Sequence, residues 1–557
     1  MEKIWLKNYP AGVPAEINPD QYQSLVQLFE EVCEKHKDNA AFYNFGIKLT
    51  YSELNQQSKI FAAYLQKVLH LKKGDRLAIM LPNLLQYPVV LFGALRAGLV
   101  VVNVNPLYTP PELTHQLQDS GTETIVVLEN FASTVGKCLN KTPLKHVIVT
   151  EIGDYFPAWK AWLTHFVLKY IHKKIPKWSL PKAHFFKKLM MQAAALEFEP
   201  VPISSQDLAF LQYTGGTTGI SKGAMLTHRN LVANVEQADA WFNNKFTRGD
   251  EIIITALPLY HIFSLLVNCL LYTTKVGGTN VLITNPRDIP RMIAVMAKFK
   301  FTGMTGVNTL FNALLKNPRF SSLDFSALKL TVGGGAAVQR SVAEEWQKVT
   351  GVVLTEGYGL TETSPCVAAN PINAPSFSGS IGFPLPSTEI CILNDEHQEV
   401  PIGQKGELAI KGPQVMRGYW QQPADAPAAF DERGWFLTGD LGFMDEEGRF
   451  RILERKKDMI LVSGFNVYPN EVEDVLAMIP GVMEAAVIGV PDENSGEAVK
   501  AFIVKNNEAL RAEDIIRICR ESLTAYKVPK FIQFCKDLPK TNVGKILRRS
   551  LREKAES

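Results

Sequence analysis

The chain has 557 residues, of which 46% are hydrophobic and 21% are charged, and its formal net charge is +3. This composition is typical of a globular protein with a large core, and the length suggests about three or four domain-sized units. The small net charge argues against a nucleic-acid-binding protein. Seven cysteines are scattered without a Cys-x-x-Cys pair, which argues for a reducing compartment and against a disulfide framework or a zinc site.

No targeting or membrane-spanning segment is evident. The N-terminus lacks the charged-then-apolar pattern of a signal peptide. The most apolar long window, residues 252–273, contains Pro258, His261 and Asn268, so we predict buried core and not a transmembrane helix. These observations predict a cytoplasmic protein.

Strand-like and helix-like segments alternate along the first part of the chain. Residues 22–70 are predicted to be helical, and Thr50 followed by Glu53 predicts a capping box within them. The alternation that follows predicts a parallel sheet covered by helices. The strand-like segments are 77–82, 100–104, 124–127, 147–149, 251–256 and 278–282, and the helix-like segments are 87–97, 262–271, 290–299 and 310–315.

The pattern of predicted secondary structure changes beyond about residue 380. Short strand-like runs with frequent glycine and proline predict a β-rich part over about 380–456. From residue 458 the pattern returns to mixed α/β, with strand-like runs at 485–489 and 499–504 and a helix-like run at 512–523. The predicted fold class is therefore α/β.

Residues 155–190, the basic aromatic insert, contain eight lysines and no aspartate or glutamate. Within 158–175, apolar residues recur at three- and four-residue spacing, which predicts an amphipathic helix. The apolar residues are Trp159, Trp162, Leu163, Phe166, Val167, Tyr170 and Ile171. A basic helix with aromatic residues on one face suits an anionic bilayer interface, so we predict peripheral membrane contact. The alternative is a helix packed on the protein's own core with solvated lysines.

Residues 213–224 read Tyr-Thr-Gly-Gly-Thr-Thr-Gly-Ile-Ser-Lys-Gly-Ala and follow a strand-like run. Glycines let the backbone approach a ligand, hydroxyl groups donate hydrogen bonds, and Lys222 adds a positive charge, which together predict a phosphate-binding loop. The segment is not a Walker A loop, because Ser221-Lys222-Gly223 reverses the required order. The alternative is a flexible surface turn.

This segment resembles the phosphate-loop signature of the adenylate-forming superfamily, which includes acyl-CoA synthetases, luciferases and peptide-synthetase adenylation domains. The resemblance implies a large N-terminal domain of two α/β sheets plus the β-rich part, followed by a small mobile C-terminal α/β domain. It also implies that the loop binds the phosphates of ATP. The residues assigned to this role are Thr214, Gly215, Gly216, Thr217, Thr218, Gly219 and Lys222.

Residues 257–263 place an aromatic side chain and His261 after a strand-like segment. A lone histidine in apolar surroundings is usually just packed. The segment matches a core motif of the family, and the resemblance implies that His261 borders the pocket for the substrate carboxylate. Glycines at 303, 306 and 333–335 leave room for an acyl tunnel. We assign the tunnel to Val307, Leu310, Phe311, Gly333 and Gly334.

Two further motifs resemble the nucleotide site of the family. Residues 331–337 are a strand-like run with three glycines, and residues 356–363 read Glu-Gly-Tyr-Gly-Leu-Thr-Glu-Thr. The first motif by itself is equally typical of a tight turn. The resemblance implies that Tyr358 stacks on adenine, Thr361 binds the α-phosphate and Glu362 binds Mg²⁺, a cation that prefers carboxylate oxygen. The AMP-binding residues assigned here are Gly335, Ala336, Ala337, Gly357, Tyr358 and Gly359.

Asp440 lies between glycines, where an aspartate often forms a turn. A carboxylate also accepts hydrogen bonds from two neighbouring hydroxyls, and the resemblance implies that Asp440 and Arg455 bind the ribose of AMP. The block 433–457 resembles fatty acyl-CoA synthetases in particular. The resemblance also implies an N-terminal adenylation domain over 1–456, a C-terminal domain over 458–557 and a hinge at Lys457.

Two motifs of the family lie beyond the hinge. Residues 462–471 match the motif that lines the coenzyme A channel, in which Gly464 and Phe465 are the channel residues. Residues 538–549 match the last core motif, in which Lys545 is the catalytic lysine. An ammonium group can lie between the attacking carboxylate and the phosphate and offset the repulsion between the two anions.

The motifs occur in order along the chain, which is identified as a member of the adenylate-forming superfamily, most similar to bacterial long-chain fatty-acid–CoA ligases. The resemblance implies that a fatty acid and Mg–ATP give acyl-AMP and pyrophosphate, and that coenzyme A then displaces AMP. The predicted catalytic residues are His261, Thr361, Glu362 and Lys545. The predicted partners are ATP, a fatty acid, coenzyme A and the inner face of the cytoplasmic membrane, with no nucleic acid and with a homodimer left open.

Three alternatives stay open at this point. A fatty acyl-AMP ligase would stop at the adenylate, but the coenzyme A motif at 462–471 disfavours it. A medium-chain or aryl-CoA ligase shares the fold, but the block 433–457 and the basic aromatic insert disfavour it. A non-catalytic membrane-binding member would be expected to lack Glu362, Asp440 or Lys545, which are all present.

Overall fold

The computed structural model describes residues 2–214, 221–242, 245–422, 429–541 and 544–556. A seven-stranded sheet carries the predicted phosphate loop at one edge. Its strands, in spatial order, are β7 (His184–Phe185), β6 (His146–Thr150), β5 (Thr124–Leu128), β3 (Arg76–Met80), β4 (Val100–Asn103), β8 (Leu208–Tyr213) and β9 (Gly223–Thr227). Neighbouring strands are parallel except for the β8–β9 pair, which is antiparallel.

A nine-stranded sheet forms the second layer. Its strands, in spatial order, are β16 (Phe383–Pro384), β15 (Cys366–Ala369), β14 (Leu354–Gly359), β13 (Leu330–Gly333), β12 (Gly303–Gly306), β10 (Ile252–Thr255), β11 (Thr279–Leu282), β1 (Ala40–Asn44) and β2 (Ile47–Thr50). The strands from β14 to β1 run parallel, and the pairs at both ends are antiparallel. The predicted parallel sheet with helical connections is thus present twice.

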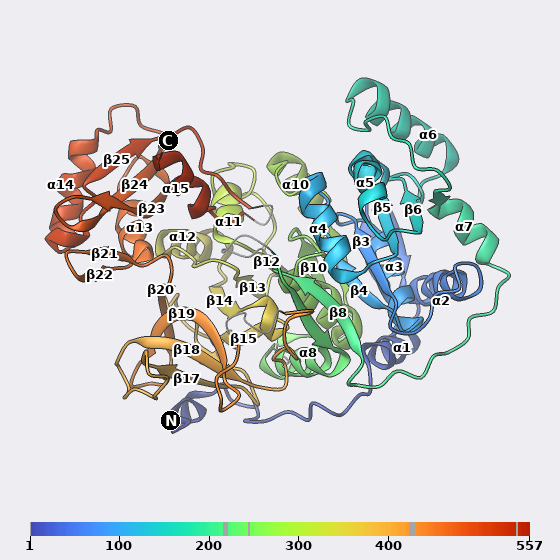
Figure 1. Cartoon of the computed structure of the whole chain (residues 1–557), viewed down its shortest axis with the longest axis horizontal. Helices are drawn as coiled ribbons and strands as arrows, with labels where there is room; N and C mark the ends of the chain where they lie inside the picture. Colours follow the sequence, from blue (N-terminus) through green and yellow to red (C-terminus); the bar gives the residue numbers. More distant parts are fainter. Residues whose placement is uncertain (1, 215–220, 243–244, 423–428, 542–543, 557) are drawn as a thin grey trace.

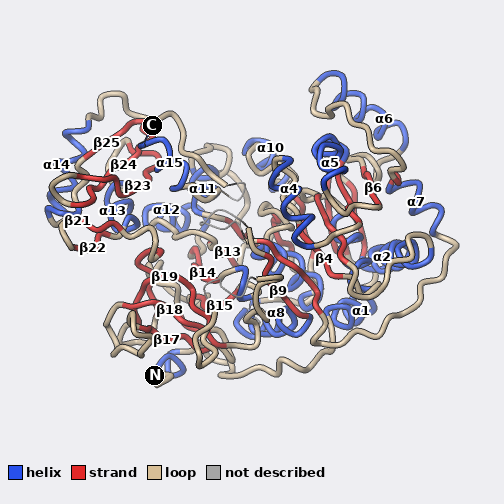
Figure 2. The backbone as a smooth tube through the Cα atoms, viewed as in Figure 1, coloured by secondary structure: helices blue, strands red, loops and turns tan. Residues whose placement is uncertain are grey.

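One continuous core lies between the two sheets. Successive residues of a strand face opposite sides, so each strand contributes alternate residues to this core and to the outer face. Leu77 and Ile79 of β3 belong to this core, whereas Ala78 and Met80 belong to a second core on the outer face. The inner helical segments are α1 (Leu25–Lys35), α2 (Tyr51–Lys67), α3 (Gln86–Arg96), α8 (His228–Phe242), α9 (Ile262–Ser264) and the π-helix η6 (Leu265–Val276). The outer core packs under α4 (Pro110–Ser120) and α5 (Ala132–Cys138). Figure 2 shows the strands enclosed by these helices.

The structure corrects the prediction that residues 22–70 are helical throughout. A hairpin of β1 and β2 separates α1 from α2, and its turn residues Phe45 and Gly46 have φ of 49° and 90°. Positive φ at both turn positions is typical of a tight hairpin. The pairing of β1 with β11, far along the chain, also stabilises the strand conformation. The capping box of Thr50 and Glu53 is confirmed at the start of α2.

The nine-stranded sheet is followed by two smaller sheets. An antiparallel four-stranded sheet contains β17 (Glu389–Leu393), β18 (Gly406–Lys411), β19 (Phe436–Met444) and β20 (Phe450–Arg455). The last sheet contains β21 (Ile460–Val462), β22 (Phe465–Val467), β23 (Val482–Asp492), β24 (Gly496–Lys505) and β25 (Phe531–Phe534), covered by α13 (Pro469–Ala477), α14 (Ala512–Ser522) and α15 (Arg548–Glu556). Figure 1 shows this C-terminal unit set apart from the two large sheets. The predicted α/β fold class is confirmed.

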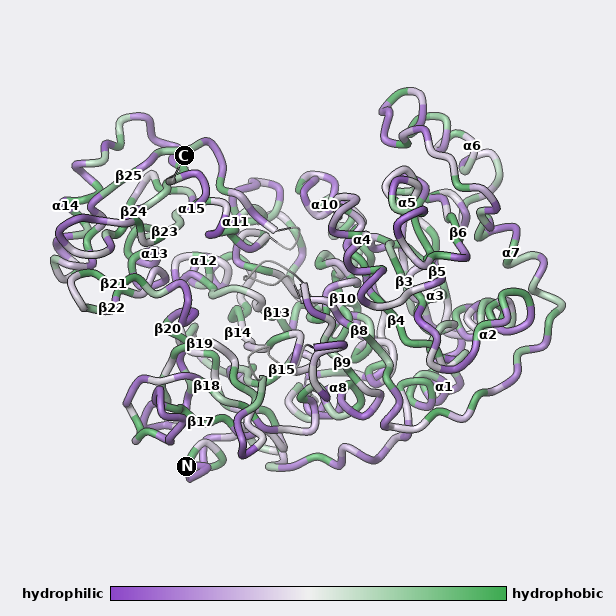
Figure 3. Tube along the Cα trace, viewed as in Figure 1, coloured by the Kyte–Doolittle hydropathy of each residue, from purple (hydrophilic) through white to green (hydrophobic). Residues whose placement is uncertain are grey.

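The basic aromatic insert stands out from the body at the edge of the molecule (Figure 1). Its helix α6 (Ala158–Phe166) continues into the π-helical turn η4 (Val167–Ile171), and α7 (Phe186–Ala193) follows. This helical segment ends at Ile171, four residues before the predicted end at residue 175. Lys173 has a φ of 50°, which is incompatible with a continuing helix. Hydrophobic positions line α6 as well as the central strands (Figure 3).

Candidate active site

The two ends of the predicted phosphate loop meet at the top of the β8–β9 hairpin. The Thr214 amide donates a hydrogen bond to the Lys222 carbonyl, with 3.0 Å between nitrogen and oxygen. The preceding Tyr213 hydroxyl donates to a carboxylate oxygen of Asp119 on α4 at 2.5 Å. Thr214 and Lys222 are therefore held at the carboxyl end of the sheet, and the assigned residues 215–219 lie outside the described part of the chain.

The residues assigned to adenine and ribose come together from three strands. Asp440 of β19 is paired in register with Arg455 of β20, and Arg455 Nε lies 2.7 Å from Asp440 Oδ1. The Tyr358 hydroxyl of β14 donates to Asp440 Oδ2 at 2.5 Å. Burial raises the pKa of Asp440, whereas Arg455 and the Tyr358 hydrogen bond oppose that rise. The three side chains form one polar cluster at the meeting point of two sheets.

Thr361 and Glu362 follow β14 on the short 3₁₀-helix η7 (Thr361–Thr363). The turn is held in place by Thr363, whose hydroxyl donates to the Pro365 carbonyl at 2.6 Å. Glu362 Oε1 accepts a hydrogen bond of 2.6 Å from the Tyr419 hydroxyl. The predicted metal ligand is therefore oriented by a residue outside every predicted motif.

Tyr419 is the residue of this site that sequence reasoning missed. Its segment pairs with β9, where the Trp420 amide donates to the Gly223 carbonyl at 2.7 Å and Tyr419 forms a bridge with Ala224. The ammonium of Lys222 lies 5.2 Å from the centroid of the Tyr419 ring. Tyr419 thus contacts both the phosphate-loop lysine and Glu362, a relation that the local sequence does not indicate.

Lys545 reaches the same cluster from the C-terminal unit. Its Cε lies 3.5 Å from the position that a Cβ on Gly335 would occupy, and the Thr309 hydroxyl donates to the Gly544 carbonyl at 3.2 Å. Burial, with a smaller contribution from the neighbouring Arg455, lowers the pKa of Lys545 to about 8. The carboxylates of Asp440 and Glu362 oppose this shift. The lysine predicted to be catalytic is therefore next to the residues assigned to AMP.

His261 is held neutral at the start of α9. Its Nδ1 accepts a hydrogen bond of 3.4 Å from the Phe263 amide, and Asn83 positions the preceding turn by accepting from the Leu259 amide at 2.8 Å. Burial lowers the pKa of His261 to about 3, with a further contribution from the Lys545 charge. A neutral imidazole can exchange hydrogen bonds with a substrate carboxylate but adds no positive charge to the site.

The glycine-rich turn after β13 allows a close approach of several elements. Gly335 has a φ of 79°, and Ala336 and Ala337 beside it are exposed. A Cβ on Gly334 would lie 3.2 Å from the Phe263 ring, and a Cβ on Gly333 would lie 2.6 Å from a Leu354 methyl group. The turn is therefore narrow on its inner side and open on the side where adenine is predicted.

The residues assigned to the acyl tunnel are buried in this structure. Val307 and Leu310 are 5% and 9% exposed, and the fully buried Phe311 packs edge-on against Trp346. Gly306 is also needed here, because a Cβ on it would lie 2.7 Å from the Phe311 ring. These side chains form an apolar wall behind the glycine-rich turn.

Comparisons with known proteins agree with this geometry. A family model described as AMP-binding enzyme matches residues 29–420, and one described as AMP-binding enzyme C-terminal domain matches residues 471–545. The chain belongs to the AMP-binding enzyme family.

A long-chain-fatty-acid–CoA ligase of Escherichia coli is 56% identical to this AMP-binding enzyme over 555 residues, which cover 100% of this chain and 99% of the relative. The anthranilate CoA ligase AuaEII in complex with anthranoyl-AMP matches with a TM-score of 0.84 at 26% identity, over 97% of this chain and 99% of the other. ATP-bound MatB from Rhodopseudomonas palustris matches with a TM-score of 0.82 at 29% identity, over 96% and 99% of the two chains. The predicted superfamily is confirmed.

The AMP-binding enzyme does not bring all predicted residues together in this arrangement. Gly464 lies in the turn between β21 and β22, and a Cβ on it would meet nothing within 4 Å. Phe465 is 57% exposed and stacks on Tyr526 of the same C-terminal unit, with ring centroids 4.9 Å apart. The β21–β22 turn thus faces away from the cluster that Lys545 enters (Figure 1).

The AMP-binding enzyme also contains a buried carboxyl group that no motif assignment used. Glu356 Oε1 accepts a hydrogen bond of 3.1 Å from the Val338 amide, which ties β14 to the end of the glycine-rich turn. Burial raises the pKa of Glu356 to about 8. Its position directly before Gly357 indicates that it supports the side of the site where adenine is predicted.

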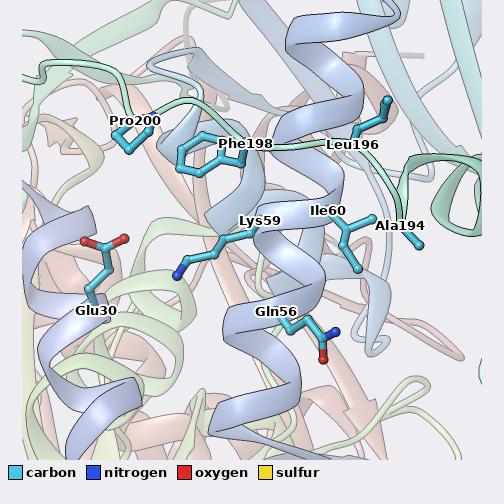
Figure 4. A pocket seen from close by; sticks show the side chains of 8 residues that line it. All are labelled: Glu30, Gln56, Lys59, Ile60, Ala194, Leu196, Phe198 and Pro200. Atoms are coloured by element: carbon cyan, nitrogen blue, oxygen red, sulfur yellow. The ribbon is translucent and has the colours of Figure 1, made fainter.

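A separate hollow of the AMP-binding enzyme lies among α1, α2 and residues 194–200 (Figure 4). It has a volume of about 410 Å³. It is lined by Glu30, Gln56, Lys59, Ile60, Ala194, Leu196, Phe198 and Pro200. Because Glu30 is already paired with the buried Arg96 and none of the predicted site residues lines the hollow, it is not part of the candidate active site.

Proposed function

We propose that this chain is a long-chain-fatty-acid–CoA ligase that forms an acyl adenylate and then transfers the acyl group to coenzyme A. The observation that carries the proposal is the position of Lys545, which lies beside Gly335 and close enough to Asp440, Arg455 and Glu362 to share their electrostatic field. The name of the 56% identical relative supports the same substrate class.

In the first half-reaction, a carboxylate oxygen of the fatty acid attacks the α-phosphorus of ATP. A phosphorus–oxygen bond forms, and the bond from that phosphorus to the pyrophosphate oxygen breaks. The Lys545 ammonium is positioned to stabilise the negative charge on both reactants, and the Thr361 hydroxyl to donate to the α-phosphate. The adenosine is held by Tyr358, Asp440 and Arg455. Because the α-phosphate is thereby oriented toward the attacking carboxylate, the activation barrier is lower.

Glu362 is the residue that would hold Mg²⁺ together with phosphate oxygens of ATP. One carboxylate plus substrate phosphates is a typical magnesium environment, and the bound cation would supply positive charge opposite the leaving pyrophosphate. The Tyr419 hydroxyl donates a hydrogen bond to Glu362 Oε1 and so orients the carboxylate. The ring of Tyr419 also supports the Lys222 ammonium, which is placed to reach the same phosphates.

In the second half-reaction, the thiol of coenzyme A attacks the acyl carbonyl carbon. A carbon–sulfur bond forms, the bond to the AMP phosphate oxygen breaks, and the thiol proton is released. Gly464 and Phe465 lie away from the cluster while Lys545 is inside it. We therefore propose that the unit 458–557 rotates about Lys457 after adenylation, so that the β21–β22 turn replaces Lys545 at the site.

The basic aromatic insert supports uptake of the fatty acid from a membrane. Trp159, Trp162, Tyr170 and Ile171 are 70%, 69%, 61% and 62% exposed, so α6 and η4 present an aromatic face that the rest of the chain does not cover. Among the helices that the structure describes, none has both the length and the apolar character that a bilayer crossing requires. We propose that this face rests in the headgroup region while the exposed lysines meet anionic lipids.

We place the enzyme on the cytoplasmic side of the membrane, where its cysteines, all free in the structure, would stay reduced. A homodimer stays a prediction, which light scattering of the purified chain would check.

The deciding experiment measures thioester formation with ATP, Mg²⁺, coenzyme A and saturated fatty acids of increasing chain length. A maximum at long chains is the expected result, because the apolar wall behind the glycine-rich turn gains contact with each added methylene. A maximum at short or aromatic acids would overturn the substrate class. Pyrophosphate release without thioester formation would instead indicate a fatty acyl-AMP ligase.

A further inference from the structure

Glu129, Glu151 and His165 meet at the base of the basic aromatic insert. Glu129 directly follows β5 and Glu151 directly follows β6, so the parallel neighbours place both carboxylates at the same edge of the sheet. His165 lies in the last turn of α6 and faces this edge. One ligand atom of each residue lies within 4.8 Å of the other two.

The distances between His165 Nδ1 and the two carboxylates suit a shared metal ion as well as an ion pair. His165 Nδ1 lies 3.2 Å from Glu129 Oε2 and 3.5 Å from Glu151 Oε2. Ligands about 2.0–2.2 Å from a tetrahedral zinc ion are separated from one another by about 3.3–3.6 Å. His165 Nδ1 therefore stands from each carboxylate at about the spacing of two ligands of one ion, and the ligand oxygens of the two carboxylates lie within 4.8 Å of each other.

Glu129 Oε2 is a buried polar atom without a hydrogen bond in the described part of the chain. The residue is 5% exposed, and this oxygen accepts no hydrogen bond although His165 Nδ1 lies 3.2 Å away. The other oxygen, Oε1, accepts a hydrogen bond of 3.3 Å from Trp178 Nε1. Such a contact orients a ligand carboxylate in metal sites, whereas an unsatisfied buried oxygen is otherwise costly.

A small cavity lies among the three side chains. Its volume is about 10 Å³, which is close to the space that one water molecule or one ion requires. Glu129, Glu151 and His165 supply the charged part of its lining, and Ile152, Leu168 and Ile175 supply the apolar part. The cavity is thus sized for a single small ligand held by nitrogen and oxygen donors.

We propose that Glu129, Glu151 and His165 bind one Zn²⁺ ion, with water as the fourth ligand. Imidazole nitrogen favours zinc over Mg²⁺ and Ca²⁺, which prefer oxygen ligands alone. The expectation of no zinc site rested on the absence of a Cys-x-x-Cys pair, whereas this site contains no cysteine. The ion has a structural role: it ties α6 to the sheet edge formed by β5 and β6 and fixes the direction in which the aromatic face of α6 points.

The main alternative is a plain ion pair between a protonated His165 and the two carboxylates. The two cases differ in what Zn²⁺ does to the protein. An ion pair leaves the affinity for Zn²⁺ at the background level of scattered cysteines and histidines, whereas a built site adds one strong equivalent and stabilises the folded chain by mass action.

The experiment uses the full chain, freed of metal by a chelator, desalted, and titrated with ZnCl₂ in excess Mg²⁺ without ATP. We expect the wild type to bind one more equivalent of zinc than Glu129→Gln and His165→Gln, with a rise in Tm of several degrees that both variants lose. Glu129→Gln keeps the size of the side chain and an oxygen acceptor for Trp178. His172→Gln, on the exposed end of the same insert, is the matched control and is expected to behave like the wild type.

Cobalt provides an independent spectroscopic measurement. Co²⁺ added to the metal-free wild type is expected to produce the visible absorption of a four-coordinate site, and Glu151→Gln is expected to weaken it. Glu151 is half-buried, so this variant tests the site even if Glu129→Gln fails to fold. Equal zinc stoichiometry and an equal Tm shift in wild type and variants would overturn the proposal and leave the ion pair. Neither readout depends on ligase activity, so failure here is distinguishable from failure of the proposed function.

Discussion

The charge of Lys545 is set by opposing influences from its neighbours. Burial and Arg455 work against its positive charge, while Asp440 and Glu362 favour it. His261, which is also close enough to interact with Lys545, avoids a second cation by staying neutral. The site therefore has one titratable cation at the reacting centre in the pH range where most proteins function.

The pKa of Lys545, about 8, predicts the pH dependence of adenylation. Because only the protonated amine is a cation, kcat/KM for pyrophosphate release should fall as pH rises through that value. In Lys545→Arg the guanidinium stays charged, so this decline should be absent even if the overall rate is lower. Lys545→Ala should lose about 10²–10³-fold in the same assay, whereas thiolysis of supplied acyl-AMP should survive.

Glu356 at this site also has a pKa of about 8. The experiment must therefore distinguish its titration from that of Lys545. A decline that persists unchanged in Lys545→Arg would assign the titration to Glu356 and contradict the prediction. Lys536→Ala, at an exposed position in the same C-terminal unit, is the control for nonspecific effects and should leave the rate and its pH profile unchanged.

Tyr419→Phe tests the hydrogen bond that orients Glu362. Loss of one hydrogen bond to a carboxylate is worth about 1.5–3 kcal/mol, so the adenylation rate at limiting Mg²⁺ should fall by about 10-fold or more. Excess Mg²⁺ should restore part of the rate, because the ring stays in place under Lys222. An unchanged Mg²⁺ dependence would show that Tyr419 only packs. Tyr170→Phe, at an exposed position of the basic aromatic insert, is the matched control.

At the scale of elements, the site is assembled from the ends of strands and the short turns that follow them. β14 leads into η7 with Thr361 and Glu362, β19 and β20 present Asp440 and Arg455, and β8 and β9 hold the two ends of the phosphate loop. The carboxyl ends of parallel strands are where α/β proteins commonly bind ligands. In contrast, α6 lies at the edge of the molecule with its apolar face exposed.

The exposed face of α6 predicts membrane binding. The double variant Trp159→Ser/Trp162→Ser should reduce co-sedimentation with anionic vesicles by at least about 10-fold, because each indole contributes about 1.5–3 kcal/mol when buried. Activity on detergent-dispersed fatty acid should remain. Leu107→Ser, an exposed apolar position outside the insert, is the control. Equal vesicle binding by the double variant and the wild type would refute the prediction.

At the scale of the whole molecule, ionic contacts join the C-terminal unit to the four-stranded sheet. Arg548 contacts Glu454 of β20 at 3.2 Å, across the predicted hinge. Arg552 contacts Asp458 at 2.7 Å within the C-terminal unit, next to that hinge. Such contacts can be exchanged at little net cost, since each replaces hydration with a charge partner. These contacts hold the C-terminal unit in the orientation that places Lys545 at the site. They do not prevent the unit from adopting a different orientation.

Lys457→Pro tests whether the chain must rotate at this point. Proline restricts φ to a narrow range, so the variant should retain pyrophosphate release in a single turnover but form thioester at least about 10-fold more slowly. Lys457→Ala keeps the backbone free and should lose much less of the second step. Equal loss of both half-reactions in Lys457→Pro would contradict a hinge and indicate local damage to the adenylation site.

The sequence by itself determined the family and the alternating fold, and its motifs predicted which residues carry the chemistry. Glycine, hydroxyl, carboxylate and lysine residues at close spacing are typical of nucleotide sites, and the family resemblance of their motifs assigned Tyr358, Glu362, Asp440 and Lys545 to one site. The structure brings these four side chains close together, and their roles stay predictions. The capping box at Thr50 was equally local. The amphipathic pattern of α6 was visible too, because helical spacing needs no knowledge of the rest of the chain.

Only the tertiary structure decided which distant residues meet. Tyr419 reaches Glu362 because its segment pairs with β9, and β1 is a strand because β11 lies beside it. Glu129, Glu151 and His165 lie on three different elements, and no spacing in the chain relates them. The physical reason is common to all three cases: long-range pairing brings side chains together at strand ends, whereas a sequence pattern reports only on neighbours within a helix turn or a strand.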